Sequence, residues 1–268
     1  MAFYSLYTIF RTGVYCFRNE IIRRMKEVRL IRIYTLSVEK AAALGESAVQ
    51  ERLPSRHARA LRMRSIKDRL LCLAAGHLLL GPLGIPEESV LRPGPFGKPA
   101  AEGRPPFSLS HSGRYAVLAV NTDVPLPADP VFQEIPCPSS LDAAEGAPVG
   151  VDIELVRPLP LRRMRGLLLP EEYAWAAGAE EDGSSDPVLR FFTLWTLKES
   201  ALKAVGTGLH RDPRKLDALP LQRGEAIRLE DTLLSAGTQV FDGHVLSVCS
   251  VPVTPLRSSL PTPPATAP

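Results

Sequence analysis

Alternating apolar positions mark one segment of this chain more clearly than any other. Residues 149–155 read Val-Gly-Val-Asp-Ile-Glu-Leu, so that branched apolar side chains alternate with small or acidic residues. Alternate residues of a β-strand share one face of the sheet. The pattern predicts a strand with one face in a core and with Asp152 and Glu154 together on the other face.

A helical period follows about forty residues later. Residues 188–205 predict a helix that ends at Gly206, the residue type that most often terminates helices. Trp195, Glu199 and Lys203 are spaced by four residues, so a helix places them on one stripe. The pattern therefore predicts a carboxylate and an ammonium group beside one another.

The rest of the chain predicts further helices and strands, in a similar arrangement in each half. We expect a helix over 55–80 that ends at Gly81, with an apolar stripe facing the core and with Arg59, Arg62 and Arg69 near one another on a second face. Short helical stretches are predicted at 161–168 and 170–177. Predicted strands cover 29–38, 107–109, 115–120, 226–229 and 244–251. A helix with antiparallel strands, given twice, predicts an α+β fold with a duplicated unit.

Composition divides the chain into five parts. Residues 29–120 form an N-terminal half, and residues 149–252 form a C-terminal half that carries the acidic residues. The stretch 121–148 holds six prolines without periodicity, and we expect it to be a mobile insertion between the halves. Residues 253–268 are rich in proline, serine and threonine, which predicts a disordered tail. Residues 1–28 form an N-terminal extension, within which Met25 is a candidate start of translation.

Charge is distributed unevenly. Residues 1–69 hold 12 Arg and 3 Lys against 5 Glu and 1 Asp, whereas the rest of the chain is net acidic. A basic N-terminal half suits an anionic ligand or an acidic partner. Zinc-finger spacing and aromatic RNA-binding motifs are missing from the sequence, so we expect no nucleic-acid partner.

Two further features of the composition bear on location. No apolar run reaches the roughly 18 residues that a membrane span requires, so we expect no membrane association. The four cysteines lack metal-binding spacing, which predicts reduced thiols and a cytoplasmic protein.

The acidic strand and the Glu199 stripe together suggest a phosphate site. If the two faces meet, three carboxylates converge beside a lysine, and such oxygen ligands suit a magnesium ion that holds a phosphate. The residues alone leave a plainer interpretation open. A Glu and a Lys four residues apart are most often a solvated pair, and an Asp-x-Glu segment is most often the wet face of a strand.

Four segments resemble, in order, the motif set of the 4'-phosphopantetheinyl transferases. They are Pro-Phe-Gly-Lys-Pro at 95–99, Phe-Ser-Leu-Ser-His-Ser-Gly at 107–113, Gly-Val-Asp-Ile-Glu at 150–154 and Trp-Thr-Leu-Lys-Glu-Ser-Ala-Leu-Lys-Ala at 195–204. Within the family the chain is similar to the longer, Sfp-type branch, over about residues 30–251. The resemblance implies a pseudo-twofold pair of halves with the active site between them.

The resemblance also implies an activity and its catalytic residues. The reaction would transfer 4'-phosphopantetheine from coenzyme A to a serine of an apo acyl or peptidyl carrier protein, with Mg²⁺ as cofactor. Asp152, Glu154 and Glu199 would hold the metal. Glu199 would also take the serine proton, a role that the family leaves open between this glutamate and a metal-bound water. Lys203 would contact the pyrophosphate and stabilise developing charge.

Five further residues would bind coenzyme A if the resemblance holds. Lys98 would lie by the nucleotide, and His111 resembles a residue that hydrogen-bonds a phosphate, with Ser110 beside it in the same motif. Arg69 matches a basic position suited to the 3'-phosphate. Arg59, or alternatively Arg56, would replace basic residues that the family carries just before its first helix.

Three residues near the proposed centre have other expected roles. We expect Trp195 to pack in the core and Lys198 to face the same ligand or the carrier protein. Glu172 matches a common family acid and is expected to support the site.

Two competing functions remain open from the sequence. A magnesium-dependent phosphohydrolase of coenzyme A or nucleotides would use the same carboxylates on water. A non-catalytic module that binds carrier proteins or nucleotides would leave the carboxylates solvated. The sequence does not distinguish carriers of fatty acid, polyketide or nonribosomal peptide synthesis, and the resemblance favours a monomer.

Overall fold

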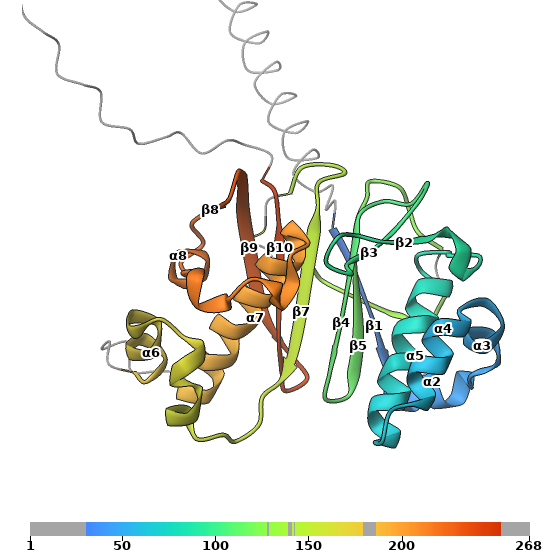
Figure 1. Ribbon diagram of the computed structural model, residues 1–268, viewed down its shortest axis with the longest axis horizontal. Helices are drawn as coiled ribbons and strands as arrows, with labels where there is room; N and C mark the ends of the chain where they lie inside the picture. Colours follow the sequence, from blue (N-terminus) through green and yellow to red (C-terminus); the bar gives the residue numbers. More distant parts are fainter. Residues whose placement is uncertain (1–30, 128, 139–140, 142, 179–185, 253–268) are drawn as a thin grey trace, which may run out of the picture.

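The computed structural model describes residues 31–127, 129–138, 141, 143–178 and 186–252. The predictions about the N-terminal extension with its candidate start and about the tail lie outside these ranges. Figure 1 shows two sheets that meet near the centre, with one group of helices on the outer side of each.

The N-terminal half builds an antiparallel sheet with the strand order β4-β5-β1-β6. Its strands are β1 (Ile31–Ser37), β4 (Phe107–Ser112), β5 (Tyr115–Asn121) and β6 (Gln133–Ile135). The helices are α2 (Val38–Leu44), α3 (Ser47–Arg52), α4 (Pro54–Leu61), α5 (Ile66–Leu80) and the 3₁₀ turn η1 (Glu88–Val90). A separate hairpin joins β2 (Leu91–Pro93) to β3 (Pro99–Ala101).

The C-terminal half builds a second antiparallel sheet with the order β7-β10-β9-β8. Its strands are β7 (Val149–Leu155), β8 (Ile227–Leu229), β9 (Thr232–Phe241) and β10 (His244–Ser250). The helices are α6 (Pro170–Ala176), α7 (Pro187–Val205) and α8 (Leu219–Gln222). Three 3₁₀ turns complete this half: η2 (Leu161–Leu167), η3 (Gly208–His210) and η4 (Pro213–Lys215).

The two halves share a topology. In each, a first strand precedes the longest helix of that half, and a later hairpin returns so that its second strand pairs with the first one. The corresponding elements are β1, α5, β4 and β5 in one half, and β7, α7, β9 and β10 in the other. The predicted α+β fold with antiparallel sheets is therefore confirmed.

Three apolar clusters hold these layers together. One lies between the N-terminal sheet and its helices, around Leu36, Leu78 and Leu118. A second lies between the C-terminal sheet and its helices, and Phe191 and Leu197 belong to it. The third unites the two sheets, and it includes Ile33, Val117, Val149, Val151, Ile153 and Val248. The apolar face predicted for residues 149–155 is thus buried between the halves.

The single helix predicted over 55–80 is wrong. Residues 62–65 separate α4 from α5, and the Ser65 side chain caps the new helix by accepting a hydrogen bond from the backbone N–H of Asp68. Such a cap satisfies one of the free N–H groups at a helix start. Arg59 and Arg69 consequently lie on different helices, so the shared face predicted for them does not follow.

The described residues of the segment 121–148 include a short strand and side-chain contacts to the rest of the fold. Residues 133–135 form β6, which extends the N-terminal sheet by pairing with β1. The Asn121 side-chain amide donates to the carbonyl oxygens of Ala144 and Ala147 at 2.7 and 2.9 Å. The described part of this segment therefore contains regular structure, while its mobility and the five-part division of the chain remain predictions.

Two simpler observations concern the described residues as a whole. None of their helices combines the length and apolarity needed to cross a membrane. Cys72 and Cys249 are free thiols, and both are buried.

Candidate active site

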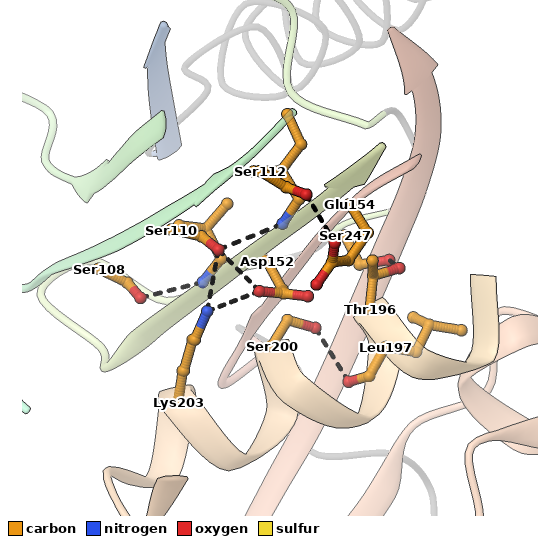
Figure 2. A network of polar contacts seen from close by, with 12 residues as sticks. Ser108, Ser110, Ser112, Asp152, Glu154, Thr196, Leu197, Ser200, Lys203 and Ser247 are labelled. Atoms are coloured by element: carbon orange, nitrogen blue, oxygen red, sulfur yellow. Dashed lines mark hydrogen bonds and ion pairs between the residues drawn. The ribbon is translucent and has the colours of Figure 1, made fainter. Parts of the chain in front are cut away.

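Strands β4 and β7 meet where the two halves join, and we call this contact the seam. Ser108, Ser110 and Ser112 alternate along β4 and point toward β7 (Figure 2). Their hydroxyl oxygens accept hydrogen bonds from backbone N–H groups of alternate residues of β7, at 3.1, 3.4 and 3.2 Å. The serine hydroxyls therefore provide hydrogen-bond acceptors for the backbone N–H groups on the edge of β7 that does not pair with β10.

Asp152 lies at the middle of the seam. It is only 4% exposed, and its Oδ1 accepts hydrogen bonds from the Ser110 hydroxyl at 2.7 Å and from the Lys203 ammonium at 2.6 Å. Its Oδ2 is buried without a hydrogen-bond partner among the described residues. A buried carboxylate oxygen without a partner is costly, so this atom is a candidate ligand-binding atom.

Glu154 follows two residues later on the same face. Its Oε2 accepts a hydrogen bond from the Ser112 hydroxyl at 2.6 Å. Burial raises the pKa of Glu154, and the Asp152 carboxylate raises it further, whereas the Ser112 hydrogen bond lowers it. The two acids predicted to share one face therefore do so, and they lie near enough to interact electrostatically.

Glu199 reaches the seam from α7. Its side chain is buried, and its Oε1 lacks a hydrogen-bond partner within the described part of the chain. Burial, followed by the charge of Asp152, raises the pKa of Glu199 to about 7, although the Lys203 ammonium lowers it. A carboxyl group with such a pKa can exchange a proton near neutral pH.

Helix α7 can lie this close to β7 because residue 150 is a glycine. A Cβ atom at Gly150 would overlap the Ser200 carbonyl oxygen and the Ala204 amide nitrogen, and it would lie 3.0 Å from the Ala204 Cα. The glycine therefore sets the distance between the acids of β7 and the Glu199 stripe of α7.

Lys203 occupies the next turn of α7. Its ammonium donates to Asp152 Oδ1 and, at 3.1 Å, to the Ser110 hydroxyl. Lys203 also lines a pocket of about 210 Å³ together with residues of the β2–β3 turn and of the segment after α7. Lys203 therefore lies between the carboxylates and the pocket, in contact with Asp152 and exposed to the cavity.

Lys98 lines the same pocket from the β2–β3 turn. Its ammonium donates to the carbonyl oxygens of Val149 and Ala204 at 2.9 and 3.4 Å, so it bridges the turn to both β7 and α7. Burial lowers the pKa of Lys98 to about 8. A cation near a helix C-terminus is favourable, and its position here brings positive charge to the pocket.

A second group of positive charges surrounds His111 on β4. Partial desolvation lowers the pKa of His111, and the charges of Lys203, Arg59 and Arg56 lower it further, although the residue remains exposed. Arg59 is exposed on α4, whereas Arg69 pairs with Glu46 at 2.5 Å. The Arg59 charge acts on His111, whereas no described contact links Arg69 to the site.

Comparison with known proteins shows which family part of the chain resembles. Residues 148–249 match the family model of the 4'-phosphopantetheinyl transferase superfamily, a stretch that runs from β7 into β10 and carries all three acids. The resemblance predicted from the motifs is confirmed.

Several curated 4'-phosphopantetheinyl transferases are similar to this chain. The transferase gsp of Aneurinibacillus migulanus is 29% identical over 133 residues, which cover 49% of this chain and 45% of the relative. The transferase Sfp of Bacillus subtilis strain 168 is 25% identical over 161 residues, which cover 58% of this chain and 60% of the relative. The matches thus span about half to three fifths of these relatives' length, and the relatives' names agree with the expectation of a transferase.

The acids of this phosphopantetheinyl-transferase-like segment suit a hard cation in their chemistry. Carboxylate oxygens are the ligands that Mg²⁺ prefers, and Asp152 Oδ2 and Glu199 Oε1 are buried without partners. As placed, however, no three His, Cys, Asp or Glu side chains of the described residues form a group that could hold a metal ion. The residue types thus suit a magnesium ion, whereas their placement in the described residues does not form a group around one point.

Lys198 does not face the ligand, and that expectation is wrong. It is fully buried, and its ammonium lies 2.7 Å from Glu172 Oε2 and 3.0 Å from the carbonyl oxygen of Pro213. Glu172 is equally buried and accepts hydrogen bonds from the backbone N–H groups of Leu169 and Ala218. One residue of helix rotates a side chain by about 100°, so Lys198 faces the core while Glu199 faces the seam.

Trp195 packs as expected, because its indole stacks on Phe191 with ring centroids 6.4 Å apart beside the C-terminal core.

Sequence reasoning missed a set of hydroxyl residues around the acids. Ser247 on β10 lies directly opposite Asp152, and its hydroxyl is 2.8 Å from those of Thr196 and Thr238. Ser112 contacts Glu154, as described above. Serine and threonine do not contribute to the hydrophobic period from which strands are predicted. The one available signal was that serines occupy every second position of residues 108–112, as the acids do in residues 152–154.

Proposed function

We propose that this protein transfers the 4'-phosphopantetheine group of coenzyme A to a serine of an apo acyl or peptidyl carrier protein. The products would be the holo carrier and adenosine 3',5'-bisphosphate. The observation that carries the proposal is the convergence of Asp152, Glu154 and Glu199 with Lys203 at the seam, in a segment that matches this transferase superfamily.

The carboxylates provide the place for a magnesium ion in this proposal. Asp152, Glu154 and Glu199 would hold it, and when bound it would supply positive charge that neutralises pyrophosphate oxygens. The remaining chemistry belongs to side chains of the protein, whose contribution is positioning and charge stabilisation.

Lys203 and Glu199 have complementary roles in the transfer. The serine hydroxyl of the carrier attacks the phosphorus that bears pantetheine, and its O–P bond forms as the bond to adenosine bisphosphate breaks. Glu199 takes the serine proton, because its pKa of about 7 lets the carboxylate accept a proton near neutral pH. The Lys203 ammonium stabilises the negative charge that develops on the phosphate oxygens.

The pocket beside Lys203 is the proposed entrance for coenzyme A. Lys98 and Lys203 line it, and Arg59 adds positive charge near His111 on β4. A polyanion such as coenzyme A suits these groups. Arg69 remains a proposed contact to the 3'-phosphate, although it pairs with Glu46 in this structure. An acidic carrier would complete the reaction, and we propose a cytoplasmic monomer without nucleic-acid or membrane partners.

The test is intact-mass spectrometry of a panel of apo carrier proteins, incubated with coenzyme A and the full-length protein, with and without Mg²⁺. We expect a magnesium-dependent gain of one phosphopantetheine on at least one carrier. Glu199→Gln should reduce the initial rate at least about hundredfold, as expected for loss of a general base. The matched control is Glu225→Gln, which removes the same charge from an exposed loop.

The alternatives give different results in the same assay. Coenzyme A that is consumed without carrier modification would indicate a phosphohydrolase. Intact coenzyme A with no modified carrier, combined with binding that survives in Glu199→Gln, would indicate a binding module. Full turnover in Glu199→Gln would refute the proposed base.

A further inference from the structure

The Lys98 side chain joins the β2–β3 turn to both elements that carry the candidate site. Its ammonium donates hydrogen bonds to the carbonyl oxygen of Val149, at the start of β7, and to that of Ala204, in the last turn of α7, at 2.9 and 3.4 Å. An ammonium group has three protons to donate. Two of them are therefore engaged by backbone groups of the protein, on two different elements.

The end of α7 requires such a partner, because the last carbonyl groups of a helix find none within the helix. The backbone N–H of Gly206 donates to the carbonyl oxygens of Leu202 and Lys203. The Lys98 ammonium serves the next carbonyl group, that of Ala204, and a cation also interacts favourably with the helix dipole there. Lys98 thus acts as a side-chain cap at the C-terminus of α7.

Both of these carbonyl groups lie close to the candidate site along the chain. Ala204 follows Lys203 directly, and Val149 precedes Asp152 by three residues. Figure 2 shows Lys203 reaching from α7 to Asp152 on β7, where the two side chains are 2.6 Å apart. A side chain that holds the end of α7 against the start of β7 therefore acts on the two backbones that place this ion pair.

We propose that Lys98 is a positioning residue, which fixes the end of α7 against β7 and so holds Lys203 where the transfer requires it. The proposal rests on the proposed function, because it assigns Lys203 to the reacting phosphate. It differs from the role that the family resemblance implies, in which Lys98 lies by the nucleotide. Loss of a uniform substrate contact raises KM and leaves kcat unchanged, whereas loss of an interaction needed in the transition state lowers kcat.

Lys98→Met removes the ammonium but keeps an unbranched side chain that can pack beside Gly206, where a Cβ atom would lie 3.8 Å from Lys98 Cδ. The matched control is Arg52→Met. Arg52 also joins two carbonyl oxygens, those of Ile85 and Pro86 at 2.8 and 2.7 Å, but it lies at the end of α3. The control therefore removes a cation that holds the backbone at a place outside the candidate site.

The experiment combines two measurements on the full-length protein at pH 7, below the Lys98 pKa of about 8, so that the wild-type side chain is charged. Hydrogen exchange without ligand should be faster over residues 200–207 in Lys98→Met but unchanged there in Arg52→Met. Steady-state transfer from coenzyme A should show kcat lowered about tenfold or more in Lys98→Met, with KM within about threefold of wild type, since a misplacement of about 1 Å can cost about hundredfold. Arg52→Met should transfer like the wild type.

Four results would overturn the positioning role while the proposed function stands. A raised KM with kcat retained would make Lys98 a substrate contact. A lowered kcat without faster exchange at the end of α7 would show that Lys98 does not act through the helix, and faster exchange with wild-type kcat would show a structural role alone. An equal loss of kcat in Arg52→Met would trace the effect to general destabilisation.

Failure of the proposed function gives a different result. The wild-type protein would then modify no carrier, and the positioning role would fail with the function. The exchange measurement would still show whether Lys98 holds the end of α7, because it requires neither substrate nor turnover.

Discussion

A methyl group at position 150 would test whether the distance between β7 and α7 sets the reactivity of the site. Gly150→Ala adds a Cβ atom that overlaps the Ser200 carbonyl oxygen and the Ala204 amide nitrogen. Both atoms belong to the backbone of α7, so no side-chain rotation can relieve the overlap. The helix itself must move away from the sheet.

The size of that movement follows from ordinary contact distances. Carbon atoms pack at about 3.5–4 Å, so α7 has to retreat by more than roughly 1 Å. Overpacking of this kind costs about 1–3 kcal/mol of stability. Glu199 and Lys203 move with the helix, and a misplacement of about 1 Å can reduce catalysis about hundredfold.

The assay compares Gly150→Ala with Gly166→Ala, because a Cβ at Gly166 meets no atom within 4 Å. Initial transfer rates by intact mass and urea unfolding are measured on both, with circular dichroism to establish folding. We expect a folded Gly150→Ala protein with a rate about hundredfold below wild type and a Gly166→Ala protein close to wild type. A Gly150→Ala rate within a few-fold of wild type would show that α7 need not lie at this distance.

Three further changes probe stability. Because burial raises the pKa of Glu199 from 4.5 in the unfolded chain to about 7, its contribution to stability is complete at acidic pH and is lost as pH rises through 7. Urea unfolding of metal-free Glu199→Gln should therefore match wild type at pH 4 but exceed it at pH 8 by up to about 3 kcal/mol, and parallel pH curves would contradict this. Lys198→Ala leaves the buried carboxylate of Glu172 without its cation and should lower the free energy of unfolding in urea by about 3–5 kcal/mol. The double variant Glu172→Gln/Lys198→Met should lose less than Lys198→Ala; equal losses in the two variants would argue against the ion pair. Gly113→Ala and Gly103→Ala both place alanine at a positive φ, but only at Gly113 would the Cβ meet a neighbouring histidine and leucine, so its melting temperature should fall further.

The elements that frame the site were predictable because they carry their own periodicity. The apolar alternation of residues 149–155 defined β7, and the spacing to Gly206 defined the end of α7. In both cases local pattern and burial agree, which is the condition under which a sequence indicates its structure.

The helix break at 62–65 was not predictable in the same way. No glycine or proline lies there, and the break depends on the Ser65 cap, which competes with a continuous helix by only about 1 kcal/mol. The direction of Lys198 differs from the prediction because a charged residue type favours an exposed position, whereas the residues around it on the helix favour the core. Leu194, Leu197 and Ala201 are all buried, so the helical period already indicated a core-facing position.

The candidate site could be predicted only as far as its charged residues. Resemblance placed Asp152, Glu154, Glu199 and Lys203, and the structure brings these four side chains into mutual electrostatic range. The partners of the acids depend on how two sheets meet, which is a tertiary property. Sequence could not show that Ser112 would meet Glu154 across the seam.

The seam has a consequence for how this chain can vary. Hydroxyls on β4 bind both the backbone of β7 and its acids, so a substitution in residues 108–112 changes the surroundings of residues 151–155 and the reverse also holds. A substitution in one strand therefore favours a compensating substitution in the other. Among related chains, substitutions at these two segments should therefore be correlated, more strongly than at pairs of strands that meet only through apolar side chains.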